Sequence, residues 1–301
     1  MFKKAALAVA LGLAVSGTAL AEAWTFNYAA ANAAEGYAPP AGPLAVAQSA
    51  LIDSLKFTAE SMIEFTSGSP FQAGSTFSDY IVLRVDQAFF GANLVNDPIN
   101  FFPTDRQITV VLEATGSFFA NGQYMFDKPG FDFKMYYDAG NGTPAAPFTL
   151  AQFGPSLAAF ADGTLVETAG LVVGGGVSSN VTPIPDGTVD IVMLMINQLQ
   201  GGFQLFDGQY DPLKLVFGLS DANNNLCEAD GGTAQCGNAT MAAALGGFNA
   251  LFGTALTNNA NIFYTQSDGS FTKQIPEPAT LALMGLGLVG MGFAARRRKS
   301  A

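Results

Sequence analysis

The clearest strand pattern in this sequence is Phe131-Asp132-Phe133-Lys134-Met135-Tyr136-Tyr137-Asp138, in which every odd position is hydrophobic. Charged residues occupy three of the four even positions. Successive side chains of an extended chain point to opposite faces, so one face of this segment is apolar and the other is charged. The pattern therefore predicts a half-buried β-strand. Residues 55–65 alternate in a similar way.

Further strands are expected where β-branched residues gather between polar or glycine-containing stretches. These segments are residues 80–86, 107–113, 165–173, 189–196 and 213–219. Seven or more short strands, in a chain with 34 Gly and 15 Pro, predict a mainly β protein. The expected body is an antiparallel β-sandwich or jelly roll.

Three other segments complete the expected body. Residues 240–256 are the best helix candidate, although Gly246 and Gly247 weaken it. Residues 261–265 and 270–274 flank Gln266-Ser267-Asp268-Gly269, which predicts a β-hairpin. Residues 174–187 are rich in glycine and proline and predict one long loop.

The body of the chain is strongly acidic, and the sequence contains no histidine. Residues 22–275 hold seven of the 13 basic residues and 23 of the 24 acidic residues, which gives a formal charge of −16. Because such a body repels phosphate, no binding to nucleic acid is expected. Without histidine the commonest general base and metal ligand are missing, and no local motif selects a catalytic pair of carboxylates. We therefore expect a protein that is not an enzyme.

The N-terminus has the layout of a secretory signal peptide. Lys3 and Lys4 precede an apolar run over residues 5–15, and Ala21 and Glu22 follow a small-x-small cleavage pattern. This layout predicts removal by signal peptidase between Ala21 and Glu22. The apolar run is only about half the ~20 residues that a membrane span needs, which argues against a retained anchor.

The C-terminus contains three elements in a fixed order. Pro276-Glu277-Pro278 is followed by the apolar residues 279–295 and then by Arg296-Arg297-Arg298-Lys299. As a helix, the apolar segment would be ~25 Å long, which suits a short transmembrane helix. The basic cluster is expected to stay in the cytoplasm, so the body lies on the far side of the inner membrane.

Together the three elements resemble the PEP-CTERM sorting signal, with Ile275 in place of the valine that usually precedes the motif. In that family an exosortase in the inner membrane of Gram-negative bacteria recognises and processes the signal, and the body is released towards the cell surface or an exopolysaccharide matrix. The resemblance implies recognition at Pro276, Glu277 and Pro278, transient retention by the helix, and a stop at Arg296, Arg297, Arg298 and Lys299. The expected domains are a signal peptide (1–21), an exported β-rich domain (22–275) and a sorting signal (276–301).

Cys227 and Cys236 are the only cysteines, and both are exported if the N-terminal interpretation holds. Two cysteines close together in a polar, glycine-rich stretch outside the cytoplasm predict a disulfide. A zinc site would need further ligands that a chain without histidine does not offer nearby.

Asp221, Asn223 and Asn225 have the alternate spacing of calcium ligands. However, Leu226 and Gly232 occupy the positions where a calcium loop needs a glycine and a bidentate glutamate. An Asn/Asp turn after the preceding strand explains the same residues. We therefore expect no metal or other cofactor, with calcium as the alternative.

A second resemblance covers roughly residues 51–275. Residues 78–84, 162–168 and 218–227 resemble segments of flocculation-associated PEP-CTERM proteins, which are extracellular and hold cells and polysaccharide together. The resemblance implies a cell-surface or extracellular-matrix protein that promotes flocculation or biofilm cohesion by contacting exopolysaccharide or neighbouring cells. The alternatives are a secreted carbohydrate-binding module, a glycan-active enzyme and a passive coat protein. A shallow aromatic strip would favour the binding module, whereas a cleft with two facing carboxylates would favour the enzyme.

Overall fold

The computed structural model describes residues 23–36, 49–95, 107–138, 157–179, 186–198, 203–205, 216–220, 225–228 and 238–274. The strands are β1 (Trp24–Phe26), β2 (Ser54–Ser67), β3 (Thr76–Phe90), β4 (Asn93–Leu94), β5 (Gln107–Phe118), β6 (Gln123–Phe126), β7 (Asp132–Asp138), β8 (Thr164–Ser179), β9 (Asp186–Gln198), β10 (Phe203–Leu205), β11 (Val216–Ser220), β12 (Asn225–Glu228) and β13 (Ile262–Gln274). The α-helices are α2 (Tyr28–Glu35) and α3 (Asn238–Phe252), and the short 3-10 helices are η3 (Ala120–Gly122), η4 (Lys128–Gly130) and η5 (Leu157–Phe160).

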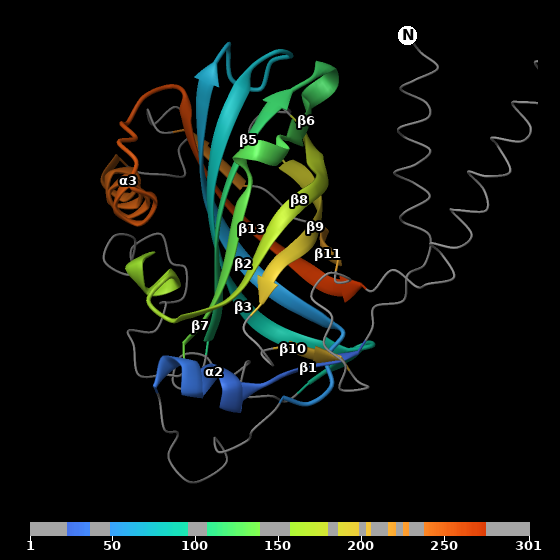
Figure 1. The fold of residues 1–301 in the computed structure, drawn as a ribbon. Helices are drawn as coiled ribbons and strands as arrows, with labels where there is room; N and C mark the ends of the chain where they lie inside the picture. The colour runs from blue at the N-terminus through green and yellow to red at the C-terminus, as the bar shows by residue number, and fades with distance from the viewer. Residues whose placement is uncertain are drawn as a thin grey trace, which may run out of the picture.

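Eight of the described strands pair in a closed antiparallel ring (Figure 1). The order of pairing is β2-β3-β5-β7-β8-β9-β11-β13, and β13 returns to β2. The strands β4, β6 and β12 add to this ring, and β1 pairs with β10 in a separate two-stranded sheet. Register shifts in the β2–β3, β7–β8 and β8–β9 pairs mark bulges, which increase the local twist and help a sheet to curve until its edges meet.

The strand β6 crosses closely between β5 and β8, and two glycines make room for it. A Cβ added at Gly116 would lie 2.4 Å from the carbonyl oxygen of Met125, and one added at Gly175 would lie 2.3 Å from that of Tyr124. Both separations are far below van der Waals contact. The glycine in each neighbouring strand is therefore required by the approach of the β6 backbone.

The inward-facing side chains form the main hydrophobic core, because alternate residues of each strand point into the closed sheet. Examples from five strands are Phe57, Leu83, Val110, Met135 and Met193, all of which are buried. The charged residues of the alternating stretches in β2 and β7 mostly lie on the outer face. The period of two in the sequence is thus the direct cause of an apolar interior.

The N-terminal segment closes one end of the sheet. The side chain of Asn27 caps α2 by accepting a hydrogen bond from the backbone N–H of Ala30 at 3.0 Å. Tyr28, at the start of the helix, packs edge-on against Phe26 with 5.3 Å between ring centroids. The hydroxyl of Tyr137 donates to Oδ1 of Asn32 at 2.9 Å, which fastens the helix to β7.

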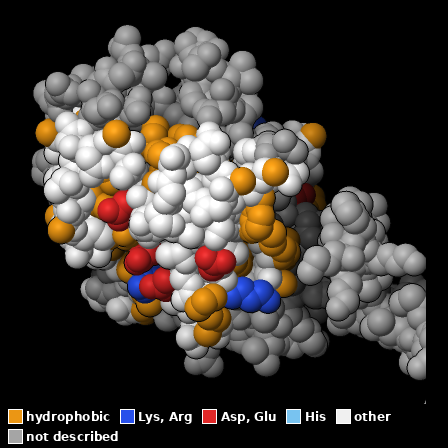
Figure 2. Space-filling view, turned by 90° about the horizontal axis from the view of Figure 1, so that it is seen from above, with side chains coloured by type: hydrophobic (Ala, Val, Ile, Leu, Met, Phe, Trp, Pro, Cys, Tyr) orange, Lys and Arg blue, Asp and Glu red, His pale blue; other side chains and the backbone are white. Residues whose placement is uncertain are grey.

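An aromatic cluster closes the opposite end. Phe71, in the turn between β2 and β3, has a φ of 58°, a left-handed conformation that is unusual for a bulky residue. Its ring centroid lies 4.8 Å from that of Phe65, 4.7 Å from that of Phe263 and 5.5 Å from that of Phe118. These ring contacts offset the backbone strain of the turn. Seen from this end, the described surface is mostly uncharged, with a few acidic and basic side chains scattered among uncharged and hydrophobic ones (Figure 2).

The outer face of β2 and β3 is covered by α3 and η5, which form a second hydrophobic core with these strands. Met241 and Phe248 of α3 are buried together with Met62 of β2 and Phe160 of η5. The hydroxyl of Thr109 in β5 donates to the carbonyl oxygen of Phe160 at 2.9 Å and fastens η5 to the sheet. One side of the closed sheet is therefore hidden from solvent by this helical cover.

The prediction of a mainly β, antiparallel body with little helix is confirmed. The single expected helical segment was too few, because the described residues also form α2 and three short 3-10 helices. All seven strands expected from the sequence are present, and α3 covers most of the expected helix. The described strands build one closed sheet together with the small β1–β10 pair, whereas a sandwich would have two sheets packed face to face. The second layer is replaced by closure, because β13 pairs with β11 on one side and with β2 on the other.

Two local predictions are wrong. The expected hairpin at residues 261–274 is a single strand, β13, which pairs with β2 without interruption from Ile262 to Thr272. The expected loop at residues 174–187 is mostly strand, because β8 continues to Ser179 and β9 begins at Asp186. In both places ladder hydrogen bonds to neighbouring strands outweigh the local preference of glycine and aspartate for turns.

The signal peptide with its cleavage site at Ala21 and Glu22, and the sorting signal at residues 276–301, lie outside the described residues. The three-part division of the chain therefore stays a prediction. Among the residues that are described, no helix has the length and apolar character needed to cross a membrane.

Candidate functional site

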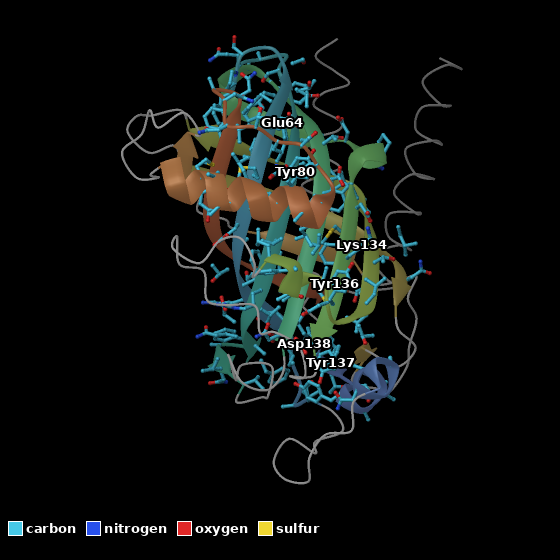
Figure 3. The ribbon with its side chains drawn as sticks, turned by 90° about the vertical axis from the view of Figure 1, so that its left-hand side faces the viewer. Glu64, Tyr80, Lys134, Tyr136, Tyr137 and Asp138 are labelled. Carbon is cyan, nitrogen blue, oxygen red and sulfur yellow. The ribbon has the colours of Figure 1, made fainter. Side chains whose placement is uncertain are left out.

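Part of the outer sheet face that α3 and η5 leave open is formed by β5, β7 and β8. We call it the β5–β7–β8 face, and it consists of Glu113, Asp132, Lys134, Tyr136, Leu165 and Thr168. The register places these residues beside one another: Glu113 lies opposite Asp132, Lys134 opposite Thr168, and Tyr136 opposite Leu165. Figure 3 looks onto this side of the molecule, where α3 lies across the strands and Lys134, Tyr136 and Asp138 follow one another along β7.

An ion pair occupies the middle of this face. The Nζ atom of Lys134 lies 2.5 Å from Oδ2 of Asp132, and the two side chains are 41% and 57% exposed. The hydrogen bond that Lys134 donates to the Asp132 carboxylate raises the pKa of Lys134, and burial of the amine partly opposes this rise. Glu113 and Asp132 are like charges directly opposite each other on neighbouring strands, an arrangement that costs stability unless a cation is near. Lys134 provides that cation.

Tyr136 contributes the aromatic surface of the face. Its ring is half-buried, and burial raises the pKa of its phenol, so the hydroxyl stays neutral at physiological pH. Leu165, its cross-strand neighbour on β8, is 44% exposed. An aromatic ring and an aliphatic side chain therefore form a small apolar platform beside charged groups.

A carboxyl group is buried under the helical cover. Glu60 of β2 is fully buried, and desolvation raises its pKa to about 8, although a hydrogen bond with Tyr264 and the charge of Arg84 both act to lower it. Burial likewise raises the pKa of the Tyr264 hydroxyl. At neutral pH Glu60 is therefore mostly protonated, which lowers the cost of holding it away from water.

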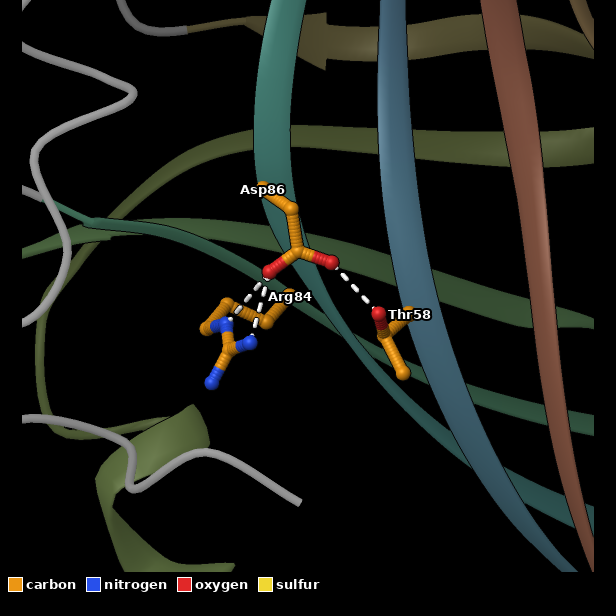
Figure 4. Close-up of polar contacts among 3 residues, drawn as sticks. All are labelled: Thr58, Arg84 and Asp86. Carbon is orange, nitrogen blue, oxygen red and sulfur yellow. Dashed lines mark hydrogen bonds and ion pairs between the residues drawn. The ribbon is translucent and has the colours of Figure 1, made fainter.

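Arg84 is held next to this acid by an ion pair with Asp86 (Figure 4). The Nε and Nη2 atoms of Arg84 donate to Oδ1 of Asp86 at 2.8 and 2.6 Å. The hydroxyl of Thr58 on the neighbouring strand donates to the other carboxylate oxygen of Asp86 at 2.5 Å. These contacts use both oxygens of Asp86, so it serves to position Arg84 and to join β2 to β3.

A second buried acid lies inside the closed sheet. Asp79 of β3 is buried, and desolvation raises its pKa to about 7, opposed by a hydrogen bond with Ser61. The hydroxyls of Ser61 and Thr265 lie 2.9 Å apart. Glu167 is also buried on the inner side of β8. These acids are packed within the protein and have no access to a large substrate.

The arrangement on the β5–β7–β8 face suits binding of a polar, ring-containing ligand. A sugar ring has an apolar side that packs on an aromatic ring and hydroxyls that bond to carboxylates, amines and threonine hydroxyls. Within the described ranges no group of three or more histidine, cysteine, aspartate or glutamate side chains could hold a metal ion.

The residues singled out from the sequence fall mostly outside the described part of the chain. This holds for Asp221 and Asn223, for Cys236, for Pro276-Glu277-Pro278 and for the basic cluster at residues 296–299. Asn225 and Cys227 lie on β12 and pair with Gln266 and Tyr264 through the backbone, but the placement of their side chains is not described. The disulfide and the calcium alternative therefore stay predictions.

The sequence alone did not reveal the β5–β7–β8 face or the buried acids Glu60 and Asp79. Its alternation rule did mark Lys134 and Tyr136 as residues of one strand face. It gave no information about which strands pair with β7, and the site depends on those neighbours. For Glu60, the alternating pattern places the glutamate on the outer face of its strand. Without knowledge of the helix that covers this face, the pattern predicts that Glu60 is exposed to solvent.

Comparison with known families concerns the end of the chain. The family model for the PEP-CTERM protein-sorting motif matches residues 274–299, and its first matched residue, Gln274, is the last residue of β13. This chain carries a PEP-CTERM sorting motif. No curated protein and no solved structure gives a significant match to the chain.

The motif confirms the resemblance inferred from Pro276-Glu277-Pro278 and the segments that follow it. A PEP-CTERM motif implies export, membrane-anchored sorting in a Gram-negative bacterium and processing by an exosortase. The motif thus indicates an exosortase-sorted extracellular protein.

Proposed function

We propose that the exported body is a non-enzymatic protein of the cell surface or extracellular matrix that promotes flocculation or biofilm cohesion by binding exopolysaccharide. The observation that carries this proposal is the sorting motif at residues 274–299. A protein sent out of the cell by this route meets polysaccharide as an abundant neighbour, so glycan is the natural ligand class for its exposed surface.

The β5–β7–β8 face is the proposed contact surface. Tyr136 and Leu165 offer an apolar platform, while Lys134, Asp132 and Glu113 offer charged hydrogen-bonding groups around it. The face lies on regular strands, whose backbone is held by ladders on both sides. It therefore keeps its shape without a ligand, which reduces the entropy lost on binding a flexible polymer.

A glycan-active enzyme is the second candidate, because Glu113 and Asp132 lie directly opposite each other. Retaining glycosidases use two carboxyl groups about 5 Å apart, which is close to the spacing of cross-strand neighbours. The two groups of a glycosidase flank the substrate from opposite sides, whereas Glu113 and Asp132 project from the same sheet face. This difference favours binding over hydrolysis.

The test is a deletion strain in which floc formation and exopolysaccharide yield are scored, followed by complementation with variants. The wild-type gene is expected to restore flocs, and Tyr136→Ala is expected to restore them poorly at equal protein level. Phe119→Ala is the matched control, because Phe119 is also an exposed aromatic residue but lies at the end of β5, away from the face.

Two outcomes decide between the candidates. A deletion strain that flocculates normally would contradict the cohesion role. Release of reducing sugar by the purified body, lost in both Glu113→Gln and Asp132→Asn, would establish the enzyme instead.

A further inference from the structure

The sorting motif begins where the closed sheet ends. Gln274 pairs with Val216 of β11, and Thr272 pairs with both Gly218 of β11 and Ser54 of β2. The sequence places Pro276 two residues after Gln274. An extended chain covers at most about 7 Å over two residues, which is less than the ~10 Å across two neighbouring strand spacings.

The first strand of the body lies at the same end. The backbone N–H of Trp24 donates to the carbonyl oxygen of Ile52 at 2.8 Å, and that of Ile52 donates back to Trp24 at 2.9 Å. Ser54, two residues after Ile52, pairs with Thr272. The first and last described strands therefore both lie towards one end of the closed sheet (Figure 1), and the motif starts two positions after Gln274, the last residue of β13.

We infer that the last turn of pairing in β13, at Thr272–Gln274, is a latch that controls exosortase processing. While these residues are paired, Pro276 can lie no more than about 7 Å from Gln274. A membrane-embedded enzyme that takes up the motif must then approach within that distance of the folded body, which restricts its access. When Thr272–Gln274 detach from β11, the linker before Pro276 lengthens from one residue, Ile275, to four, residues 272–275. Exosortase thus acts before the latch closes or when it opens.

Local opening of this segment is physically reasonable. Strand ends separate more readily than strand centres, because fewer ladder bonds and contacts must be broken. Beyond Thr272 the described partner of β13 is β11 alone, whereas residues 262–272 are held by β2 as well. Ile262, Phe263 and Tyr264 are buried. The strand can therefore release its last residues while its buried part stays in place.

The test locks β13 with cysteine pairs at increasing distance from the motif, using the full-length protein in the exporting bacterium. V216C/Q274C leaves one residue (Ile275) before Pro276, and S54C/T272C leaves three (residues 273–275). Register partners on adjacent antiparallel strands have the Cα separation that a disulfide needs. S61C/T265C is the matched control, because it crosslinks β2 to β13 far from the motif.

Processing is followed by pulse-chase, as conversion of the full-length chain to the shorter form. V216C/Q274C is expected to lose processing, S54C/T272C to slow it, and S61C/T265C to leave it unchanged. A thiol reductant should restore processing in the locked variants. A Gly-Ser linker of about ten residues inserted after Ile275, with a mean reach of roughly 17 Å, should restore it without reduction.

Three results would overturn the latch. The first is processing of oxidised V216C/Q274C at the wild-type rate. The second is an equal block in all three crosslinked variants, since distance from the motif would then be irrelevant. The third is a crosslinked variant whose processing is restored by the reductant but not by the inserted Gly-Ser linker. The single-cysteine variants control for effects of the substitutions themselves.

Discussion

The hydroxyl groups of Ser61 and Thr265 lie 2.9 Å apart inside the closed sheet, joining β2 to β13 beside the carboxyl group of Asp79. Asp79 forms a hydrogen bond with Ser61 through its side chain, while its Oδ1 atom has no hydrogen-bond partner among the described residues. Burial raises the pKa of Asp79 to about 7 and that of Glu60, on the outer side of β2, to about 8. Two neighbouring strands therefore each hold an acid that prefers to be neutral.

We expect the folded protein to be most stable at mildly acidic pH and to lose stability as the pH rises towards 8. In the unfolded chain both acids release their protons above about pH 4, whereas in the folded protein they keep them until about pH 7 and 8. Between about pH 4 and 8 the folded state thus binds more protons than the unfolded state, so the free energy of unfolding falls as the pH rises. Once the pH exceeds the folded pKa of an acid, each unit by which that pKa exceeds the unfolded value has lowered the free energy of unfolding by about 1.4 kcal/mol. Urea unfolding at a series of pH values measures this slope.

The variant Glu60→Gln is expected to flatten the decline between about pH 5 and 8, because it removes one proton that the folded state retains. Glu113→Gln is the matched control, since it removes a carboxylate from an exposed position on the same outer face. An unchanged slope in Glu60→Gln, or an equal change in both variants, would show that the buried acid does not set the pH dependence.

Much of the fold follows from period-two patterns alone, as β2 and β7 show. Their hydrophobic residues, including Phe57 and Phe133, line the interior, and their charged residues lie mostly outside. The sequence pattern failed at Asp268-Gly269, a turn signal within β13. There the partners of β13 determine the structure, because continuous pairing with β2 satisfies backbone groups that a turn would leave to water.

Ring closure and the site were harder to predict, because both depend on contacts between distant segments. The pairing of β7 with β8 and of β13 with β2 brings together residues that are far apart in the sequence. Likewise, Glu60 is buried only because α3 and η5 cover β2. A single sequence reports the face on which a residue lies, but not what covers that face.

Asn249 is expected to be the most sensitive polar residue of α3. Its Oδ1 accepts hydrogen bonds from the backbone N–H of Leu256 at 2.7 Å and from the hydroxyl of Thr254 at 2.8 Å. Its Nδ2 donates a hydrogen bond to the carbonyl oxygen of Leu256 at 2.9 Å. Asn249→Ala should destabilise the protein by about 1–3 kcal/mol, because it leaves partly buried backbone groups unsatisfied. The exposed Asn258→Ala is the control. Equal midpoints of urea unfolding for the two variants would contradict the assigned role.

The exported form is expected to contain no free thiol, because Cys227 and Cys236 should be joined. Closing a loop of this size stabilises a protein by up to about 3 kcal/mol in the chain-entropy model. Thiol titration of the unfolded, unreduced protein gives the answer directly. Two titratable thiols in protein collected outside the cell would rule out the disulfide.

Cohesion is expected to depend on divalent cations. The body has a formal charge of −16 over residues 22–275 and therefore repels acidic polysaccharide. A monovalent salt at 0.1 M screens this repulsion only at distances beyond about 10 Å. Calcium or magnesium can go further by bridging carboxylates of protein and glycan, because hard cations favour oxygen ligands. The exposed carboxylates of Glu113 and Asp132, opposite each other on the β5–β7–β8 face, are the protein groups best placed for such a bridge.

A chelator should disperse flocs of the wild-type strain, and calcium or magnesium should restore them. The double variant Glu113→Gln/Asp132→Asn should form weaker flocs, and added cation should strengthen them less. The control is Glu64→Gln, which removes a charge from β2 on the same side of the sheet and should respond to cation more than the double variant does. If wild-type flocs are indifferent to the chelator, the bridging mechanism is wrong, and cohesion must then rest on direct contacts such as those of Tyr136.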